Sequence, residues 1–164
     1  MTQEYTIKLP SEYLEHPQKE DLEKELGAVQ AHFDDTSLQL EPDFISFIFL
    51  KGFYSHINRS TLVMGVFVNT LPDEIFTFGG SLKLRHINND DFSAEVDILA
   101  RNESIEQLKT NEGVLVHIEI PTEGLTGNLI IEANEIEATF ANIEYARLSD
   151  EASKSQQVDL EDKI

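Results

Sequence analysis

The segment from residue 43 to residue 56, DFISFIFLKGFYSH, is apolar on both faces of an extended backbone. Side chains of a β-strand point alternately to opposite faces, so a strand with one wet face alternates apolar and polar residues. Here every position from 44 to 50 is apolar except Ser46. The segment TLVMGVFV at 61–68 repeats this character after the turn-like stretch INRS at 57–60. We therefore predict a hairpin that needs a covering layer on each of its two faces.

In later segments apolar and polar residues alternate, which predicts strands with one solvent-exposed face. In FSAEVDI at 92–98 and GVLVHIEI at 113–120, every second residue is apolar. The sequence NNDD at 88–91 predicts a turn, because Asn and Asp tolerate left-handed backbone and bond locally. The tract 129–148 predicts one bent strand or two strands broken near 133–134, in which Ile136, Ala138 and Phe140 share a face.

Two further strands and one helix complete the pattern. A short strand is predicted at 5–9, and another leads from Phe76 through Gly79-Gly80, where paired glycines indicate a bulge. The stretch 17–33 has the spacing of an amphipathic helix with one apolar stripe, made of Leu22, Leu26, Val29 and Phe33. An isolated helix this short is marginal, so we expect the stripe to lie on the apolar hairpin.

Many short strands with turn signals between them predict a mainly β fold. We expect an antiparallel, immunoglobulin-like β-sandwich of about six to eight strands with the N-terminal helix packed on it; an α+β fold is the alternative. Residues 1–148 are predicted to form a single β-rich domain. Residues 149–164 are polar and aperiodic, and we expect a flexible acidic tail there.

The charge balance bears on partners. Acidic residues outnumber basic ones 31 to 12, giving a formal charge of −19. Such a chain repels nucleic-acid backbones and anionic lipid, so neither is an expected direct partner. The chain has no cysteine, which excludes disulfides and thiolate chemistry. We found neither a signal peptide nor a membrane-length apolar run, and we expect a cytoplasmic protein.

No catalytic motif stands out. The sequence contains no nucleophile elbow and no glycine-rich phosphate loop, so we expect neither an enzyme nor a cofactor. The acidic stretches 33–37 and 88–91 do not follow the spacing of a calcium loop and are interpreted as turns, although calcium binding there stays open. We interpret the histidines as structural; a metal site made by His86 and His117 is the weak alternative. The histidines are His16, His32, His56, His86 and His117.

The stretch GVFVNTLPDEIFTFGGSLKLRHINNDDFSAEVDIL resembles the central signature of the SLAP domain, a small module of Gram-positive bacteria found in proteins of accessory secretion and S-layer assembly. The matching residues are Phe67, Asn69, Pro72, Phe78, Gly79, Leu82, Leu84 and Phe92. Val68 stands where the family has arginine, and the chain lacks the tryptophan of the family's closing segment. The likeness spans about residues 12–120 and implies an assembly or binding module rather than a catalyst.

We therefore expect a non-catalytic protein-binding or assembly module, with an adaptor in secretion or cell-envelope assembly as one form. Its partner is a protein, and self-association into a homo-oligomer is an alternative way to cover the apolar hairpin. An acidic oligomeric holdase chaperone and a small-molecule-binding β protein are the other hypotheses. The candidate interface residues are Phe44, Phe47, Phe49, Phe53, Tyr54, Leu62, Met64 and Phe67.

Overall fold

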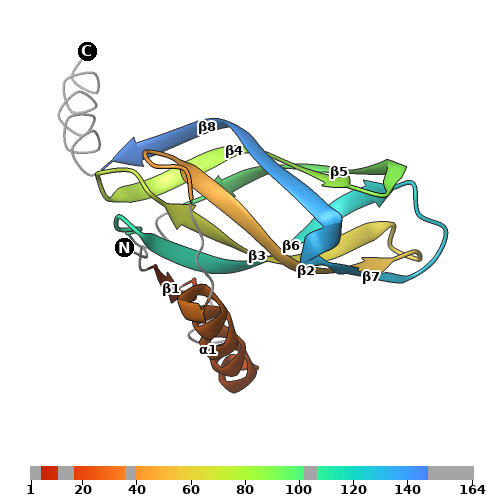
Figure 1. Cartoon of the computed structure of the whole chain (residues 1–164), viewed down its shortest axis with the longest axis horizontal. Coiled ribbons are helices and arrows are strands. Elements are labelled where there is room, and N and C mark those ends of the chain that lie inside the picture. Colours follow the sequence, from red (N-terminus) through yellow and green to blue (C-terminus); the bar gives the residue numbers. More distant parts are fainter. Residues whose placement is uncertain (1–4, 11–16, 36–39, 102–106, 148–164) are drawn as a thin grey trace, which may run out of the picture.

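The computed structural model of the chain describes residues 5–10, 17–35, 40–101 and 107–147 (Figure 1). The predicted tail at 149–164 lies outside them. The strands are β1 (Thr6–Lys8), β2 (Ile45–Ser55), β3 (Ser60–Asn69), β4 (Ile75–His86), β5 (Asn89–Ala100), β6 (Glu112–Glu123), β7 (Leu129–Glu132) and β8 (Ile136–Arg147). The helical elements are α1 (Lys19–Asp35) and the short 3-10 helix η2 (Ala133–Glu135). The mainly β class with an N-terminal helix is therefore confirmed.

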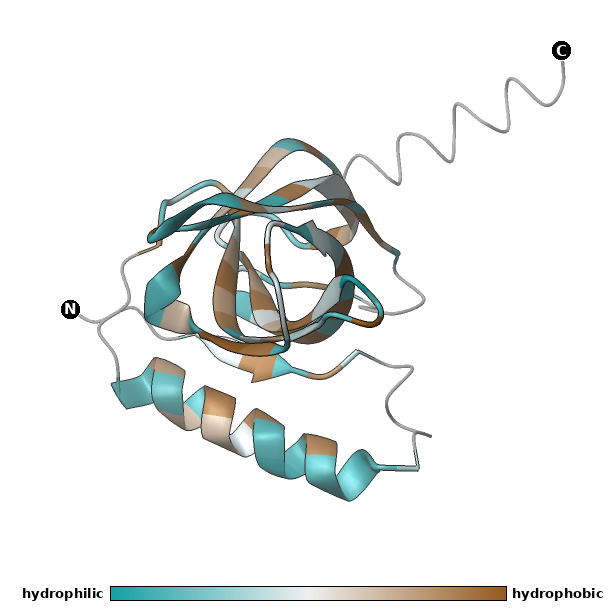
Figure 2. Ribbon diagram, turned by 90° about the vertical axis from the view of Figure 1, so that its right-hand side faces the viewer, coloured by the Kyte–Doolittle hydropathy of each residue, from teal (hydrophilic) through white to brown (hydrophobic). Residues whose placement is uncertain are grey.

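The strands form one continuous sheet with the order β7-β2-β3-β6-β5-β4-β8, and β1 joins it beside β6. Only β1 runs parallel to its neighbour among the paired strands of the described residues. Figure 2 shows the sheet curling around a central core, with α1 lying outside it. The packing is sandwich-like as predicted, but one curled sheet stands in place of the two separate sheets of an immunoglobulin domain.

The inner face of the curled sheet holds an aromatic core. The Phe67 ring lies 4.8 Å from Phe47, 5.1 Å from Phe78 and 5.0 Å from Phe140, measured between centroids. These rings come from β2, β3, β4 and β8, so they join strands that are far apart in the strand order. Tilted and edge-to-face pairs at such distances contribute about 0.5–1.5 kcal/mol each beyond their buried area.

A bulge in β2 decides which residues of that strand face inward. Phe49 pairs with Gly65 and Lys51 with Met64, so Leu50 is the extra residue. Because one extra residue reverses the alternation, odd positions face the core before the bulge and even positions face it afterwards. The same register places Gly65 under Phe47, where an added Cβ would lie 2.2 Å from the phenylalanine ring.

α1 and β1 cover part of the outer face of the hairpin, so that part is buried on both faces as predicted. A second apolar cluster fills this layer, made of Tyr5, Ile7, Val29, Phe33, Val66, Val68 and Leu115. The Gln30 side chain fastens the helix to β1, since its Oε1 accepts from the Ile7 amide at 2.7 Å and its Nε2 donates to the Tyr5 carbonyl at 2.8 Å. Hence the apolar stripe of α1 docks where the sequence predicted.

Two strand features predicted by the sequence are confirmed. The register between β4 and β8 shifts between Gly79 and Ser81, which is the bulge that the paired glycines indicated. The tract 129–148 holds two strands, β7 and β8, broken by η2 at Ala133–Glu135.

The turn predicted at 88–91 is wrong in position. Only Ile87 and Asn88 form the turn, and β5 already begins at Asn89. The hairpin closes early because His86 pairs with Asn89 across it, and the His86 Nδ1 accepts from the Asn88 amide at 3.1 Å. Local side-chain bonding of the kind predicted is present, but one residue earlier along the chain.

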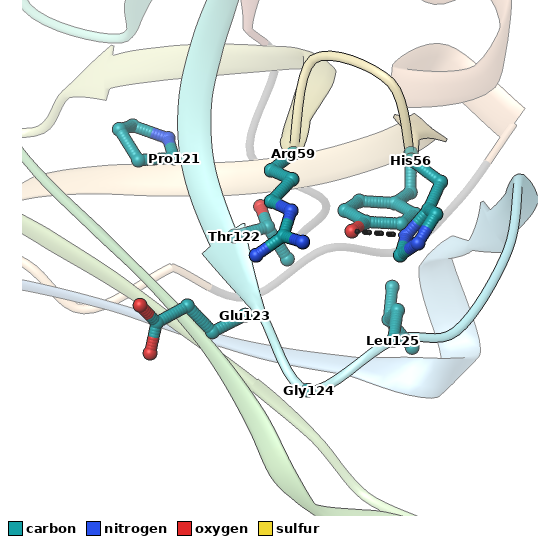
Figure 3. Close-up of a pocket in the computed structure, with 8 residues that line it drawn as sticks. His56, Arg59, Pro121, Thr122, Glu123, Gly124 and Leu125 are labelled. Atoms are coloured by element: carbon teal, nitrogen blue, oxygen red, sulfur yellow. Dashed lines mark hydrogen bonds between the residues drawn. The ribbon is translucent and has the colours of Figure 1, made fainter.

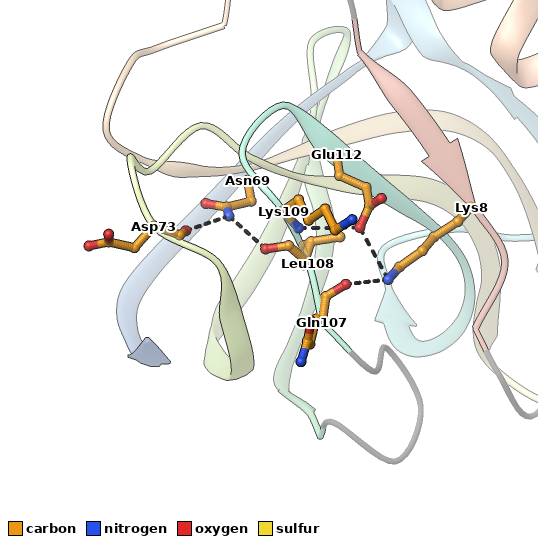
Figure 4. A network of polar contacts seen from close by, with 7 residues as sticks. All are labelled: Lys8, Asn69, Asp73, Gln107, Leu108, Lys109 and Glu112. Atoms are coloured by element: carbon orange, nitrogen blue, oxygen red, sulfur yellow. Dashed lines mark hydrogen bonds and ion pairs between the residues drawn. The ribbon is translucent and has the colours of Figure 1, made fainter. Parts of the chain in front are cut away.

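A buried asparagine ties the end of β3 to the segment before β6 (Figure 4). The Asn69 Nδ2 donates to the carbonyls of Asp73 at 3.1 Å and Leu108 at 2.9 Å. Nearby, Lys8 of β1 forms an ion pair with Glu112 at 3.1 Å. Every buried side-chain nitrogen and oxygen within the described ranges has a hydrogen-bond partner, so this network is structural.

Candidate protein-binding surface

The outer face of β3 changes from covered to open along its length. Val66 and Val68 are fully buried under α1 and β1, and Met64 is partly buried at the edge of the same cluster. Two residues earlier on the same face, the Leu62 side chain is 49% exposed. The helix therefore covers one half of this face and leaves the other half open.

Three apolar side chains line up across the open half. Phe53 pairs with Leu62 on one side and with Ile130 on the other, so the three lie side by side on neighbouring strands. Their exposed fractions are 51% for Ile130, 50% for Phe53 and 49% for Leu62. We call Ile130, Phe53 and Leu62 the apolar row. Cross-strand neighbours of this kind have Cβ atoms about 5 Å apart, so the row is a continuous surface.

Charged residues surround the apolar row. Glu119 of β6 pairs with Leu62 and continues the row on that side. On the next row, Glu132 pairs with Lys51, and both flank the apolar side chains. The Lys51 ammonium lies 5.6 Å from the centre of the Phe53 ring, within range of a cation–π contact. An apolar centre with a charged rim is the usual composition of a protein-binding surface.

The boundary between the two halves is held by a contact from the helix. His117 of β6 pairs with Met64 of β3, and its Nε2 lies 2.5 Å from the Glu25 Oε1 of α1. This bond joins the helix to the sheet at the last covered position before the apolar row. The helix is thereby fixed beside the row rather than over it.

The structure separates the eight candidate interface residues into three groups. Phe53 and Leu62 belong to the apolar row, and Met64 lies at its covered border. Phe44 is partly buried just before β2 begins. The remaining four are buried residues and do not belong to the apolar row: Phe47, Phe49, Tyr54 and Phe67. The bulge at Leu50 explains the division, because it turns Phe53 outward and Tyr54 inward.

Sequence reasoning missed the third member of the row. Ile130 lies in the segment LII at 129–131, which is apolar at consecutive positions as the hairpin is. Its neighbour Leu129 is also 40% exposed. A hollow of about 290 Å³ lies beside the row between Phe53, Leu129 and Ile130. The two-sided apolar signal was therefore present in the sequence at β7.

A second, apolar hollow lies where the sheet closes on itself. It has a volume of about 430 Å³ and is lined by Phe44, Ile45, Leu71, Phe140 and Tyr145, among others. β2 and β8 meet here, although no ladder pairs these two strands in the described residues. We call it the seam pocket.

His86 and His117 do not come together. His86 contacts Glu135 at 3.4 Å, and β5 separates its strand β4 from β6, which carries His117. Within the ranges described, no group of three or more His, Cys, Asp or Glu side chains could hold a metal ion. None of the described helices is both long enough and apolar enough to cross a membrane.

No protein-family model, curated protein or solved structure matches this chain. The resemblance to the SLAP domain stays a prediction.

Proposed function

We propose that the chain is a non-catalytic protein-binding module that holds its partner on the apolar row. The observation that carries this proposal is the alignment of Ile130, Phe53 and Leu62 on three neighbouring strands, each about half exposed. Single exposed apolar residues are ordinary, whereas a contiguous patch with a polar rim is typical of an interaction site. Aromatic anchors such as Phe53 are enriched in interface centres.

The charge of the chain supports a basic, amphipathic segment as the partner. A formal charge of −19 attracts cationic partners over a distance and repels a second copy of the same chain. Glu119 and Glu132 at the rim of the row can pair with lysine or arginine beside the partner's apolar residues. Electrostatic complementarity of this kind raises the association rate and selects against acidic competitors.

The size of the row limits the strength of the interaction. A stable interface buries roughly 800 Å² on each partner, which is more than three half-exposed side chains supply. The rim and the hollow beside Leu129 must therefore contribute, and a transient complex is expected. An adaptor role in secretion or cell-envelope assembly is what the SLAP resemblance adds to this proposal.

A designed peptide tests the proposal. The probe is a synthetic amphipathic helix with leucine on one face and lysine on the other; the same peptide with glutamate replacing lysine is its control. In amide NMR titrations, the lysine peptide should shift signals of β2, β3 and β7, and the glutamate peptide should not. Phe53→Ser should abolish the shifts, whereas Ile57→Ser should keep them, because Ile57 is 92% exposed in the turn outside the row. Equal binding by the Phe53→Ser variant would refute the apolar row as the binding surface.

Two measurements separate the alternatives. A holdase should suppress aggregation of an unrelated unfolded protein at a near-equal molar ratio. Suppression that persists in the Phe53→Ser variant would favour a holdase over the proposed binding module. Light scattering separates a homo-oligomer from a monomer. A monomer mass agrees with the proposal, whereas a dimer that Leu62→Ser dissociates would make a second copy the occupant of the row.

The seam pocket favours a second candidate function, the binding of a small apolar molecule. Its volume of about 430 Å³ lies within the range of ligand pockets, and its walls are mostly aromatic and aliphatic. Indole is a suitable neutral probe. Saturable NMR shifts confined to residues 43–45 and 140–145 would support this function, and the absence of such shifts would remove it.

A further inference from the structure

A third hollow, at the turn end of the β2–β3 hairpin, brings several hydrogen-bond donors together. It has a volume of about 380 Å³ and lies between the hairpin turn and the end of β6 (Figure 3). Tyr54, His56 and Arg59 line it from the hairpin, and Thr122 and Leu125 line it from the β6 side. The apolar row lies on the outer face of the same hairpin and contributes none of these residues.

Backbone and side-chain bonds hold the hairpin side of this hollow in place. The Tyr54 hydroxyl lies 3.1 Å from the His56 Nδ1, and the His56 amide donates to the Asn128 Oδ1 at 2.9 Å. The Thr122 amide donates to the Arg59 carbonyl at 2.9 Å, which ties the turn to β6. A hydroxyl that donates to Nδ1 leaves the proton of the neutral imidazole on Nε2, the nitrogen that can meet a ligand.

Among the described residues Arg59 has no ion-pair partner, whereas Arg85, for example, pairs with Glu137. Figure 3 shows the Arg59 guanidinium pointing into the hollow in front of Thr122; Glu123 also lines the hollow, but its carboxylate points away from the guanidinium. Arg59 thus places a positive charge in this hollow of a chain whose formal charge is −19, and Glu123 is the acidic residue of its lining.

We infer that this hollow binds a carboxylate attached to a small apolar body. The planar guanidinium of arginine matches a carboxylate through two parallel hydrogen bonds, and charge-assisted bonds are roughly twice as strong as neutral ones. The Nε2–H of the His56 imidazole adds a donor beside it, and the Tyr54 hydroxyl holds that ring in place through Nδ1. Leu125 and Pro121 supply an apolar wall for the body of the ligand.

The acidic residues elsewhere weaken this binding but do not abolish it. In about 0.15 M salt the Debye length is about 8 Å, so distant carboxylates are largely screened while a direct contact is not. Glu119, a further acid near the hairpin, is engaged with the Ser60 hydroxyl at 2.7 Å. The contact with Arg59 therefore decides whether an acid is held.

An NMR titration of the full chain with phenylacetate tests the inference, and phenylacetamide is the neutral control of the same shape. Phenylacetate should give saturable shifts at residues 54–59 and 121–125, and phenylacetamide should bind at least ~10-fold more weakly because it lacks the charge. Inorganic phosphate, which has no apolar body, should also bind more weakly. Equal binding of acid and amide, equal binding of phosphate, or no shift with phenylacetate would each overturn the assignment.

Matched variants locate the site. Arg59→Gln keeps the length of the side chain, and the fold uses the Arg59 carbonyl rather than its side chain, so the variant should fold and lose at least ~10-fold in affinity for phenylacetate. Arg85→Gln removes the exposed arginine that pairs with Glu137 and should leave the affinity unchanged. Phe53→Ser should also bind phenylacetate normally, so failure of this site and failure of the apolar row are distinguishable. Unchanged affinity in a folded Arg59→Gln variant would refute the site.

Discussion

The two halves of the outer face of β3 have the same apolar character and opposite surroundings. Val66 and Val68 lie under α1 and β1, whereas Leu62 lies open beside Phe53 and Ile130. β3 pairs with β6 in one antiparallel register along its length, whereas its pairing with β2 shifts at the bulge at Leu50. The two halves of this face differ in their cover, because α1 and β1 lie over only one of them.

Apolar residues on both faces of a strand require a covering layer, but they do not determine whether the same chain or another molecule supplies it. α1 has 17 residues, and a helix about 10 Å wide covers a band about two strands wide, since strands lie about 4.8 Å apart. One such helix cannot cover the whole outer face of β7, β2, β3 and β6. The uncovered half is left for another molecule.

The largest effect is expected from a charge placed in the covered half. Val66→Asp buries a carboxylate in a fully apolar layer, and the effective cost of burying an unpaired ion is several kcal/mol. Since whole domains are stable by about 5–15 kcal/mol, we expect this variant to be largely unfolded. Circular dichroism and denaturant titration would measure this, and a melting temperature close to that of the wild type would show that Val66 does not lie in a covered, apolar layer.

Two phenylalanine truncations, one in the covered layer and one in the open half, should differ in the stability that they cost. Phe33→Ala removes a buried ring from α1 and should lower the free energy of unfolding by about 3 kcal/mol. Phe53→Ala removes a half-exposed ring and should cost about 1 kcal/mol or less, because less surface is returned to water. Urea titration of both variants gives the two values, and equal losses would contradict the difference in cover.

A smaller effect is expected from the bonds that fasten the helix. Gln30→Ala removes two hydrogen bonds to β1 and should cost about 1–3 kcal/mol, because the Ile7 amide and the Tyr5 carbonyl lose their partner. Asp34→Ala is the control, since it removes only the contact at 3.0 Å between Gln30 and Asp34. Hydrogen exchange should accelerate at β1 in the first variant only; acceleration in both would assign the effect to the helix as a whole.

The smallest effect on stability is expected in the open half. Leu62→Asp should change the free energy of unfolding by no more than about 0.5 kcal/mol, as surface substitutions usually do. The same variant should no longer bind the lysine peptide, because the charge interrupts the apolar row at one end. A stable variant that still binds the peptide would show that the open half of this face is not the binding surface.

The sequence was sufficient for the elements and insufficient for their faces. Alternation in β5 and β6, the stripe of α1 and the glycines of β4 predicted those elements close to their observed positions. The faces of β2 could not be assigned, because a segment that is apolar at every position gives no sign of the bulge at Leu50. Whether Phe53 or Tyr54 would face outward therefore depended on tertiary packing.

The candidate sites were predictable only in part. The hairpin was identified as an association surface, yet the row needed Ile130, which lies far along the chain and reaches Phe53 only through the pairing of β7 with β2. The hollow at Arg59 had no sequence signal, since its residues come from two segments that only the closed sheet brings together. Long-range pairing, not local pattern, makes both sites.

Thiol labelling tests the central claim most directly, because the chain contains no cysteine of its own. Leu62→Cys and Val66→Cys place a single thiol on the same face of β3, one in the open half and one under α1. We expect the first variant to react with a thiol reagent about as fast as the unfolded chain does. The second should react only as fast as the helix detaches or the fold opens. Equal labelling rates for the two folded variants would contradict the division of this face into a covered and an open half.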